Sequence, residues 1–364
     1  MEQWNVPAPR IPGLDMARVV MLVGALVAFD LLAQPYAGWF SDQHSAAVGP
    51  TVPWGFLCTL LVVVIPGFFV ISGYLASGLL QRAKFRGFLV SRLKRIVPLL
   101  ALGMLVGVYS HFWVHLLPLY FLVICTVVAV FLSWVSRRVS FSLRSRLSVY
   151  TNLLDFGPAW IGGYGLLIAL ASGSLEPFTP TLSWPALVDW HLGVYSYLNF
   201  SVGWMLHRAG STALKRLANC ALIYLVFGAV VLSVAGSLPS YLTQPAMVVG
   251  GFIFAFALIG GFLAFGHRNN SVWVYLANAG LWVYVWQPIL VVLTVASGPI
   301  ARLGLLGLPA WALLPIDGLT AAVLLLAIFQ LAIHRTPLRH GLSGRRRLRT
   351  AAPSAVVGEA SPES

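Results

Sequence analysis

Long apolar blocks, separated by short polar segments, limit what this chain can fold into more than any other feature. The blocks fall at residues 16–37, 55–80, 93–111, 113–135, 155–172, 187–207, 217–236, 244–266, 272–297 and 310–333. Most approach or exceed the roughly 20 residues that a helix needs to cross about 30 Å of hydrocarbon. Charged residues make up only 9% of the chain, whereas a soluble domain carries about 25%. The sequence therefore predicts an all-α integral membrane protein with about ten transmembrane helices in a single bundle.

The cations alternate between successive loops. The basic segments carry Arg82, Lys84, Arg86, Arg92, Lys94, Arg95; Arg137, Arg138, Arg144, Arg146; Arg208, Lys215, Arg216; Arg268; and the arginines of the tail, residues 335–349. The intervening loops hold Asp42, Glu176 and Asp189, with Arg302 as their one cation. Because Lys and Arg mark cytoplasmic loops, both termini are predicted to be cytoplasmic and the protein to be multi-pass in the cell membrane.

This topology sets the predicted domain organisation and excludes two other classes. Residues 1–15 form a cytoplasmic N-terminus, 16–334 the transmembrane domain, and 335–364 a basic and then disordered cytoplasmic tail. The net charge of +13 reflects topology, so no nucleic-acid partner is expected. The three cysteines lie unpaired in apolar blocks, which favours neither a disulfide framework nor a metal site. The fifth block contains Pro158 and a Gly162-Gly163 pair, which indicates a kinked or partly re-entrant segment.

Ionisable groups inside apolar blocks are the first candidates for function, since burying them in a membrane is costly. The first block holds Arg18 and Asp30, with Asp15 one turn before Arg18. One interpretation pairs Asp15 with Arg18 at the cytoplasmic end and leaves Asp30 in the outer half. The other makes Arg18 a clamp for an anionic group, because a guanidinium matches phosphate geometry.

Two further segments are candidates. His111 and His115 are four residues apart around Trp113, so on a continuous helix both histidines share a face. They suit a general base near neutral pH or an interfacial position better than a metal site. The basic stretch 82–95 is amphipathic enough to lie on the membrane surface, either as plain topology or as a dock for a polyanionic cofactor. The Ser72-Gly73-Tyr74 segment favours close helix packing over a nucleophilic serine.

At these residues the chain resembles the acyltransferase 3 family of membrane O-acyltransferases, most nearly its glucan-succinylating branch. The matching segments, in chain order, are Leu14-Asp15-Met16-Ala17-Arg18, residues 66–75 (PGFFVISGYL), residues 88–98 (FLVSRLKRIVP), His111-Phe112-Trp113, residues 200–206 (FSVGWML) and residues 335–339 (RTPLR). The resemblance covers nearly the whole chain. It implies transfer of an acetyl- or succinyl-like group from cytoplasmic acyl-CoA, the co-substrate, to a hydroxyl of an extracytoplasmic glycan or lipid, without a metal.

The chain departs from the family pattern at two positions. The family pairs the helix-one arginine with a histidine eleven residues later, on the same helix face about 16 Å away. Phe29 occupies that position here, and Asp30 is displaced by about 120° around the helix. Near the C-terminus, where the family has Tyr-x-x-His before a proline, the chain reads Tyr284-Val285-Trp286-Gln287-Pro288.

The resemblance therefore predicts an O-acyltransferase with a substituted base. Asp30 or His111 would be catalytic, and Arg18 would bind the donor. Arg92, Lys94 and Arg95 would hold the phosphates of CoA, and Trp113 and His115 would face the acceptor. The alternative is a catalytically inactive relative that exports or flips a glycan or lipid, or acts as an assembly partner. A secondary transporter is least favoured, since no inverted repeat is evident.

Overall fold

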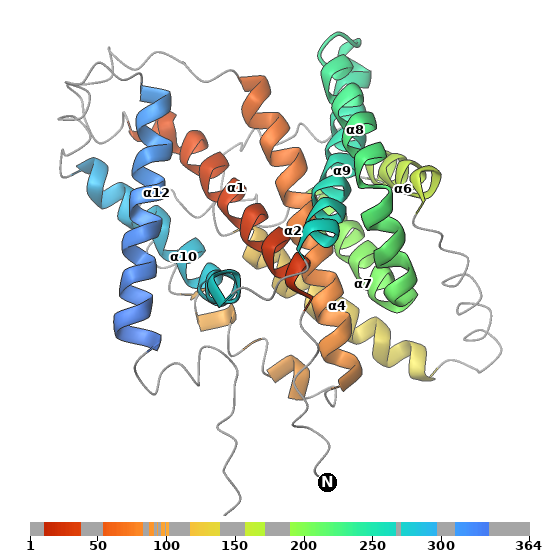
Figure 1. Cartoon of the computed structure of the whole chain (residues 1–364), viewed down its shortest axis with the longest axis horizontal. Coiled ribbons are helices and arrows are strands. Elements are labelled where there is room, and N and C mark those ends of the chain that lie inside the picture. Colours follow the sequence, from red (N-terminus) through yellow and green to blue (C-terminus); the bar gives the residue numbers. More distant parts are fainter. Residues whose placement is uncertain are drawn as a thin grey trace, which may run out of the picture.

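The computed structural model describes a helical protein (Figure 1). The described residues are 11–37, 54–82, 87–90, 93, 96–98, 100–101, 117–138, 157–171, 190–266, 271–296 and 310–334. Within them the structure contains helices and no strand. The helices are α1 (Pro12–Ala37), α2 (Trp54–Arg82), α4 (Leu117–Arg138), α6 (Pro158–Ala171), α7 (Trp190–Asn219), α8 (Ala221–Ala235), α9 (Ser240–Phe265), α10 (Ser271–Ala296), α12 (Ala310–Ile328) and the π-helix η5 (Phe329–His334).

The predicted apolar blocks coincide with these helices, apart from 93–111, most of which lies outside the described residues. Within the described residues, three helical segments are long and apolar enough to cross a membrane: Thr59–Gln81, Pro118–Val135 and Tyr241–Phe265. A fourth exists if His191–Asn219 and Ala221–Ala235, which meet at 63°, form one broken span. The all-helical class and the presence of apolar helices able to cross a membrane are thus confirmed.

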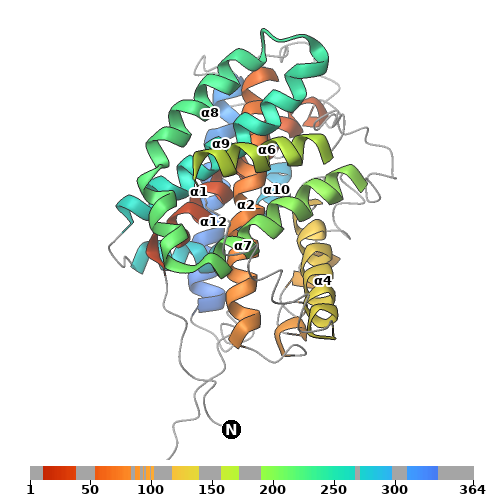
Figure 2. The same ribbon diagram turned by 90° about the vertical axis from the view of Figure 1, so that its right-hand side faces the viewer.

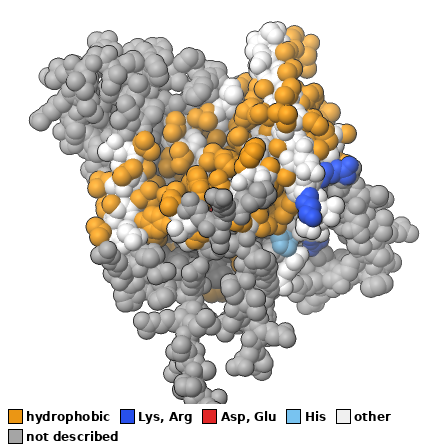
Figure 3. Space-filling view, viewed as in Figure 1, with side chains coloured by type: hydrophobic (Ala, Val, Ile, Leu, Met, Phe, Trp, Pro, Cys, Tyr) orange, Lys and Arg blue, Asp and Glu red, His pale blue; other side chains and the backbone are white. Residues whose placement is uncertain are grey.

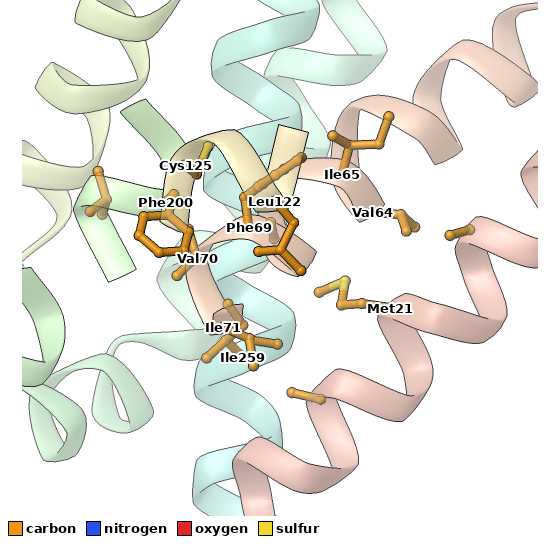
Figure 4. Close-up of a cluster of buried hydrophobic side chains, with 14 of the residues drawn as sticks. Met21, Val64, Ile65, Phe69, Val70, Ile71, Leu122, Cys125, Phe200 and Ile259 are labelled. Carbon is orange, nitrogen blue, oxygen red and sulfur yellow. The ribbon is translucent and has the colours of Figure 1, made fainter. Parts of the chain in front are cut away.

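The core lies where α1, α2, α4, α7 and α9 meet (Figure 4). Met21 on α1 approaches Val64 and Ile65 on α2, and Phe69 lies beside Leu122 of α4. These side chains are at least nine-tenths buried and belong to one continuous apolar cluster. Helix α6 crosses over α9 and α7 on one side (Figure 2), while α10 and α12 pack beside α1 on the other. Helix α1 therefore lies inside the bundle rather than at its edge.

Much of the described outer surface is apolar (Figure 3). Helix α8 buries Tyr224 and Gly228 against α9. Its other face exposes Leu222, Val226 and Phe227, the first of them to 70%. Single exposed apolar residues are ordinary, but contiguous faces of this kind indicate contact with a membrane or another protein. The surface is therefore consistent with the membrane association that the apolar helices suggest.

The fifth apolar block forms a short, unbroken helix. Helix α6 begins at Pro158, a residue preorganised for the first helical position. It continues through Gly162-Gly163 to Ala171 without a break, so the kink expected within this block is absent from the described helix. Its 14 residues extend about 21 Å, less than the roughly 30 Å of a hydrocarbon core.

The sixth block ends differently from the prediction. The sequence places a basic loop after residue 207, but α7 is helical to Asn219. The chain changes direction at Gly210, whose φ of 78° and ψ of −158° are non-helical. Glycine has no Cβ and reaches this backbone region readily, so two helical segments join without an intervening loop. The cations Lys215 and Arg216 consequently lie on a helix, and the predicted loop is wrong in conformation.

Candidate functional site

The helix-one and helix-two segments that resemble the acyltransferase family lie on adjoining helices. A Cβ placed on Gly67 would lie 2.6 Å from the Met21 sulfur, and one on Gly24 would lie 2.8 Å from Cγ2 of Val64. Residue numbers therefore increase along α1, from 21 to 24, where they decrease along α2, from 67 to 64. The two helices are antiparallel, and Arg18 lies on the part of α1 that faces the signature segment 66–75.

Residues 200–206 of α7, which also resemble the acyltransferase family, contact the same signature segment 66–75. A Cβ on Gly73 would overlap the carbonyl oxygen of Phe200, and one on Gly203 would overlap the carbonyl oxygen of Val70. Two glycines thus let the backbones of α2 and α7 touch, as small residues do between membrane helices. The packing role predicted for Gly73 is confirmed. The segment 66–75 therefore contacts the segment 200–206, while the same helix α2 packs against α1, which carries residues 14–18.

Arg18 is half-buried on α1, beside Ala17, which is fully buried. Asp15 and Arg18 each take part in an interaction within the protein. One turn earlier, Gly13 packs against the backbone of Phe262 at the end of α9. Arg18 thus lies one to two turns from a close helix junction, which is a partly enclosed position suited to an ion pair or to an anionic ligand.

The other predicted site residues are not placed by the structure. Asp30 belongs to the backbone of α1, twelve residues or about 18 Å from Arg18, but its side chain lies outside the description. His111, Trp113, His115, Arg92, Lys94 and Arg95 lie outside the described residues. Within the described part of the chain, no group of three potential metal ligands comes together.

The positions where the family has its C-terminal motif are buried beside α1. A Cβ on Gly280 of α10 would contact Leu22 of α1, one turn beyond Arg18. On the same helix, Tyr284 and Gln287 are buried, the latter completely. Gln287 is an amide and cannot act as a general base, whereas histidine can. The second departure from the family pattern therefore lies in the interior, on a helix that packs against α1.

A polar row on α7 escaped the sequence analysis. Tyr195, Ser196 and Asn199 are almost completely buried. The Asn199 side-chain amide donates a hydrogen bond to the Tyr195 carbonyl oxygen at 2.8 Å. Within the described structure, the Asn199 Oδ1, the Tyr195 hydroxyl and the Ser196 hydroxyl have no hydrogen-bond partner. Such groups are expensive to bury without water or a ligand. The sequence contains one indication of this row: Tyr195 and Asn199 are polar residues inside an apolar block and are spaced four residues apart, so they share a helix face.

His207 also escaped the sequence analysis. Its ring lies edge-on to Tyr74, with centroids 4.9 Å apart. A Cβ on Gly78 would lie 2.8 Å from its Nε2. The imidazole thus packs against the end of the helix-two signature, one turn past the close α2–α7 contact. Histidine is the side chain whose charge changes most readily near neutral pH, so His207 is a further candidate for proton transfer.

The chain matches no protein-family model, no curated protein and no solved structure.

Proposed function

We propose that this protein is a membrane O-acyltransferase with about ten transmembrane helices and both termini in the cytoplasm. The observation that carries the proposal is that α2 packs against α1, which carries Arg18, and that its segment 66–75 contacts the segment 200–206 of α7. Residues 14–18 lie on the part of α1 that faces the signature segment 66–75 of α2. Sequence resemblance predicts that these segments act together, and their contact in the fold supports that prediction.

Relative helix directions support the proposed topology. Helices α1 and α2 are antiparallel, because Met21 contacts Gly67 and Gly24 contacts Val64. Val70 contacts Gly203, and Tyr74 contacts His207 four residues further on both helices, so α2 and α7 are parallel. The alternation of basic loops requires both relations, because the first block runs outward and the second and sixth run inward.

In the proposed reaction, the acceptor hydroxyl oxygen attacks the thioester carbonyl carbon of acyl-CoA. A C–O bond forms, the C–S bond breaks, and CoA leaves as a thiol. Asp30 or His111 removes the hydroxyl proton, and Arg18 binds an anionic group of the donor. Arg92, Lys94 and Arg95 hold the CoA phosphates from the cytoplasmic side, and Trp113 and His115 contact the glycan or lipid acceptor.

The first test measures acyl-CoA binding and acyl transfer or hydrolysis by the purified full-length protein in detergent. Arg18→Ala is expected to weaken binding about 10-fold or more, since a hydrogen bond to a charged group contributes about 1.5–3 kcal/mol. Arg216→Ala, an exposed cation on α7, is the matched control and should bind normally. Asp30→Asn should bind acyl-CoA but lose turnover. Equal binding by wild type and Arg18→Ala would refute the role of Arg18.

The alternative is a catalytically inactive relative that flips or exports a glycan or lipid, or assists assembly. A specific observation favours it: Phe29 and Gln287 occupy the two positions where the family has histidine, and neither side chain accepts a proton. Acyl-CoA binding without turnover in any acceptor mixture would support this alternative. Absence of acyl-CoA binding would refute the acyl-CoA-dependent enzyme.

Topology has its own test. Single cysteines at positions 45 and 343, in a background lacking Cys58, Cys125 and Cys220, would be probed with a membrane-impermeant thiol reagent on intact cells. Position 45 should react from outside, and position 343 only after the membrane is opened. Reaction of position 343 in intact cells would contradict the proposed orientation.

A further inference from the structure

A pocket of about 200 Å³ lies between α4 and α7, away from Arg18. It is lined by Ala129, Leu132, Ser133, Tyr197, Phe200, Ser201, Trp204, Met205 and Arg208. Most of this lining is apolar or aromatic. Arg208 supplies a cation, and Ser133, Ser201 and Tyr197 supply hydroxyl groups. The lining residues include no acidic side chain, so the pocket is chemically amphipathic and positively charged.

The register of the two helices places the pocket towards their basic ends. A Cβ on Gly193 would lie 3.4 Å from Cε1 of Phe121, which fixes one contact level between α7 and α4. Eight residues further along both chains, Ser201 and Ala129 line the pocket together. The two helices therefore run parallel. The pocket lies towards Arg208 on α7 and towards the C-terminal end of α4, whose last two residues are Arg137 and Arg138. In the proposed topology this is the cytoplasmic side.

The pocket opens at the edge of the bundle. Among the described helices, α4 packs mainly against α7 and α2 (Figure 2). Its outward residues Phe131, Leu132 and Trp134 are exposed, and so is Arg208. An apolar exposed wall beside a cation is the pattern that accommodates lipid chains and headgroup together.

Size and charge decide among ligands. The volume of about 200 Å³ is below the roughly 300–1,000 Å³ typical of sites that enclose a drug-sized molecule or cofactor. It has room for a compact headgroup but not for a whole CoA molecule. A zwitterionic headgroup would place a second cation near Arg208, whereas an anionic headgroup would not.

We propose that this pocket binds the headgroup of an anionic phospholipid from the cytoplasmic leaflet. Arg208 holds the phosphate between the Ser133 and Ser201 side chains, and the acyl chains lie along Phe131 and Leu132. The Ser201 hydroxyl donates to the Leu198 carbonyl oxygen, so its oxygen is left to accept from a headgroup hydroxyl. Basic pockets between transmembrane helices on the cytoplasmic side bind such headgroups. The site does not depend on acyl-transfer chemistry, so loss of acyl-CoA binding in Arg18→Ala would leave lipid binding intact.

The test measures phospholipid binding by native mass spectrometry on the full-length protein. Phosphatidylglycerol and phosphatidylcholine are titrated separately. The expected result is a preference for phosphatidylglycerol that Arg208→Gln weakens about 10-fold, the loss of one charge-assisted contact. Lys215→Gln removes an exposed cation from the same helix but not from the pocket, and should change binding less than twofold.

A second variant keeps the inference testable if Arg208→Gln does not fold. Ser201→Leu retains every charge and fills the pocket, so it should also reduce phosphatidylglycerol binding. Equal losses in Arg208→Gln and Lys215→Gln would overturn the proposal in favour of general surface charge. Equal binding of phosphatidylcholine would overturn it as well. Competition by free sn-glycerol 3-phosphate at phosphatidylglycerol concentrations would show a soluble-anion site instead of a lipid site.

Discussion

The close contact of α2 and α7 can be tested by adding single methyl groups. In Gly203→Ala, the new Cβ would overlap the carbonyl oxygen of Val70, and in Gly73→Ala it would overlap that of Phe200. Both obstacles are backbone atoms, so a rotamer change cannot relieve them. The two helices must separate by about 1.5 Å or more to restore a contact distance of roughly 3.5 Å.

That separation would disrupt one of the most extensive helix contacts in the described structure. Overpacking of this kind costs about 1–3 kcal/mol, and sometimes more. The double variant should cost much less than the sum, because one helix displacement relieves both overlaps. The matched control is Gly162→Ala, whose Cβ would have no neighbour within 4 Å. It should be neutral or stabilising by up to about 1 kcal/mol, since alanine favours helices over glycine.

Thermal unfolding in detergent, followed by loss of the monodisperse peak on size exclusion, measures these differences. Gly203→Ala and Gly73→Ala should each lower the midpoint by several degrees, at roughly 2–4 °C per kcal/mol. Gly162→Ala should leave the midpoint unchanged or raise it. An unchanged midpoint in Gly203→Ala beside an unchanged control would refute the close approach of α2 and α7.

Further outcomes are expected from the same assay. Gly78→Ala should be tolerated at under about 1 kcal/mol, because the obstacle is the His207 ring, which can move; a loss as large as in Gly73→Ala would contradict this. Gly210→Ala should destabilise by about 1–3 kcal/mol, because its φ of 78° is strained for any residue with a Cβ; an unchanged midpoint would argue against the kink. Tyr195→Phe should be neutral or stabilising, because it removes a buried hydroxyl without a hydrogen-bond partner in the described structure. Tyr275→Phe, by contrast, should cost about 0.5–1.5 kcal/mol, since it loses a hydrogen bond of 2.6 Å to the Leu326 carbonyl oxygen; the reverse order would refute both assignments.

The positions of the helices could be predicted because a membrane helix has to be apolar along its whole length. Where the described residues allow comparison, the blocks 55–80 and 244–266 correspond to α2 and α9 to within a few residues. The ends were harder to predict. Cations after residue 207 indicate a loop, yet Gly210 alone turns the chain and the helix resumes. Lys and Arg residues indicate on which side of the membrane a segment lies, but they do not determine whether its backbone is helical.

The candidate site was predicted in part. Arg18 was chosen because a charge inside an apolar block is costly, and it lies on the part of α1 that faces the helix-two signature. Polar groups without formal charge gave a weaker signal, so Tyr195, Ser196 and Asn199 were missed. His207 was missed because it is the last residue of the apolar block 187–207, directly before Arg208, where a polar side chain is ordinary for a helix end. Its contact with Tyr74 depends on a residue more than a hundred positions away.

The sequence by itself determined that the protein is helical and rich in segments able to cross a membrane, because local composition decides whether a segment is stable in lipid. Only the tertiary structure decided which segments meet. The pairing of Val70 with Gly203, and the pocket beside Arg208, arise from close packing between helices distant in the chain. Uniformly apolar helices carry little pattern to specify their partners. Small residues and rare polar groups select those contacts, and their effect appears only once the helices are assembled.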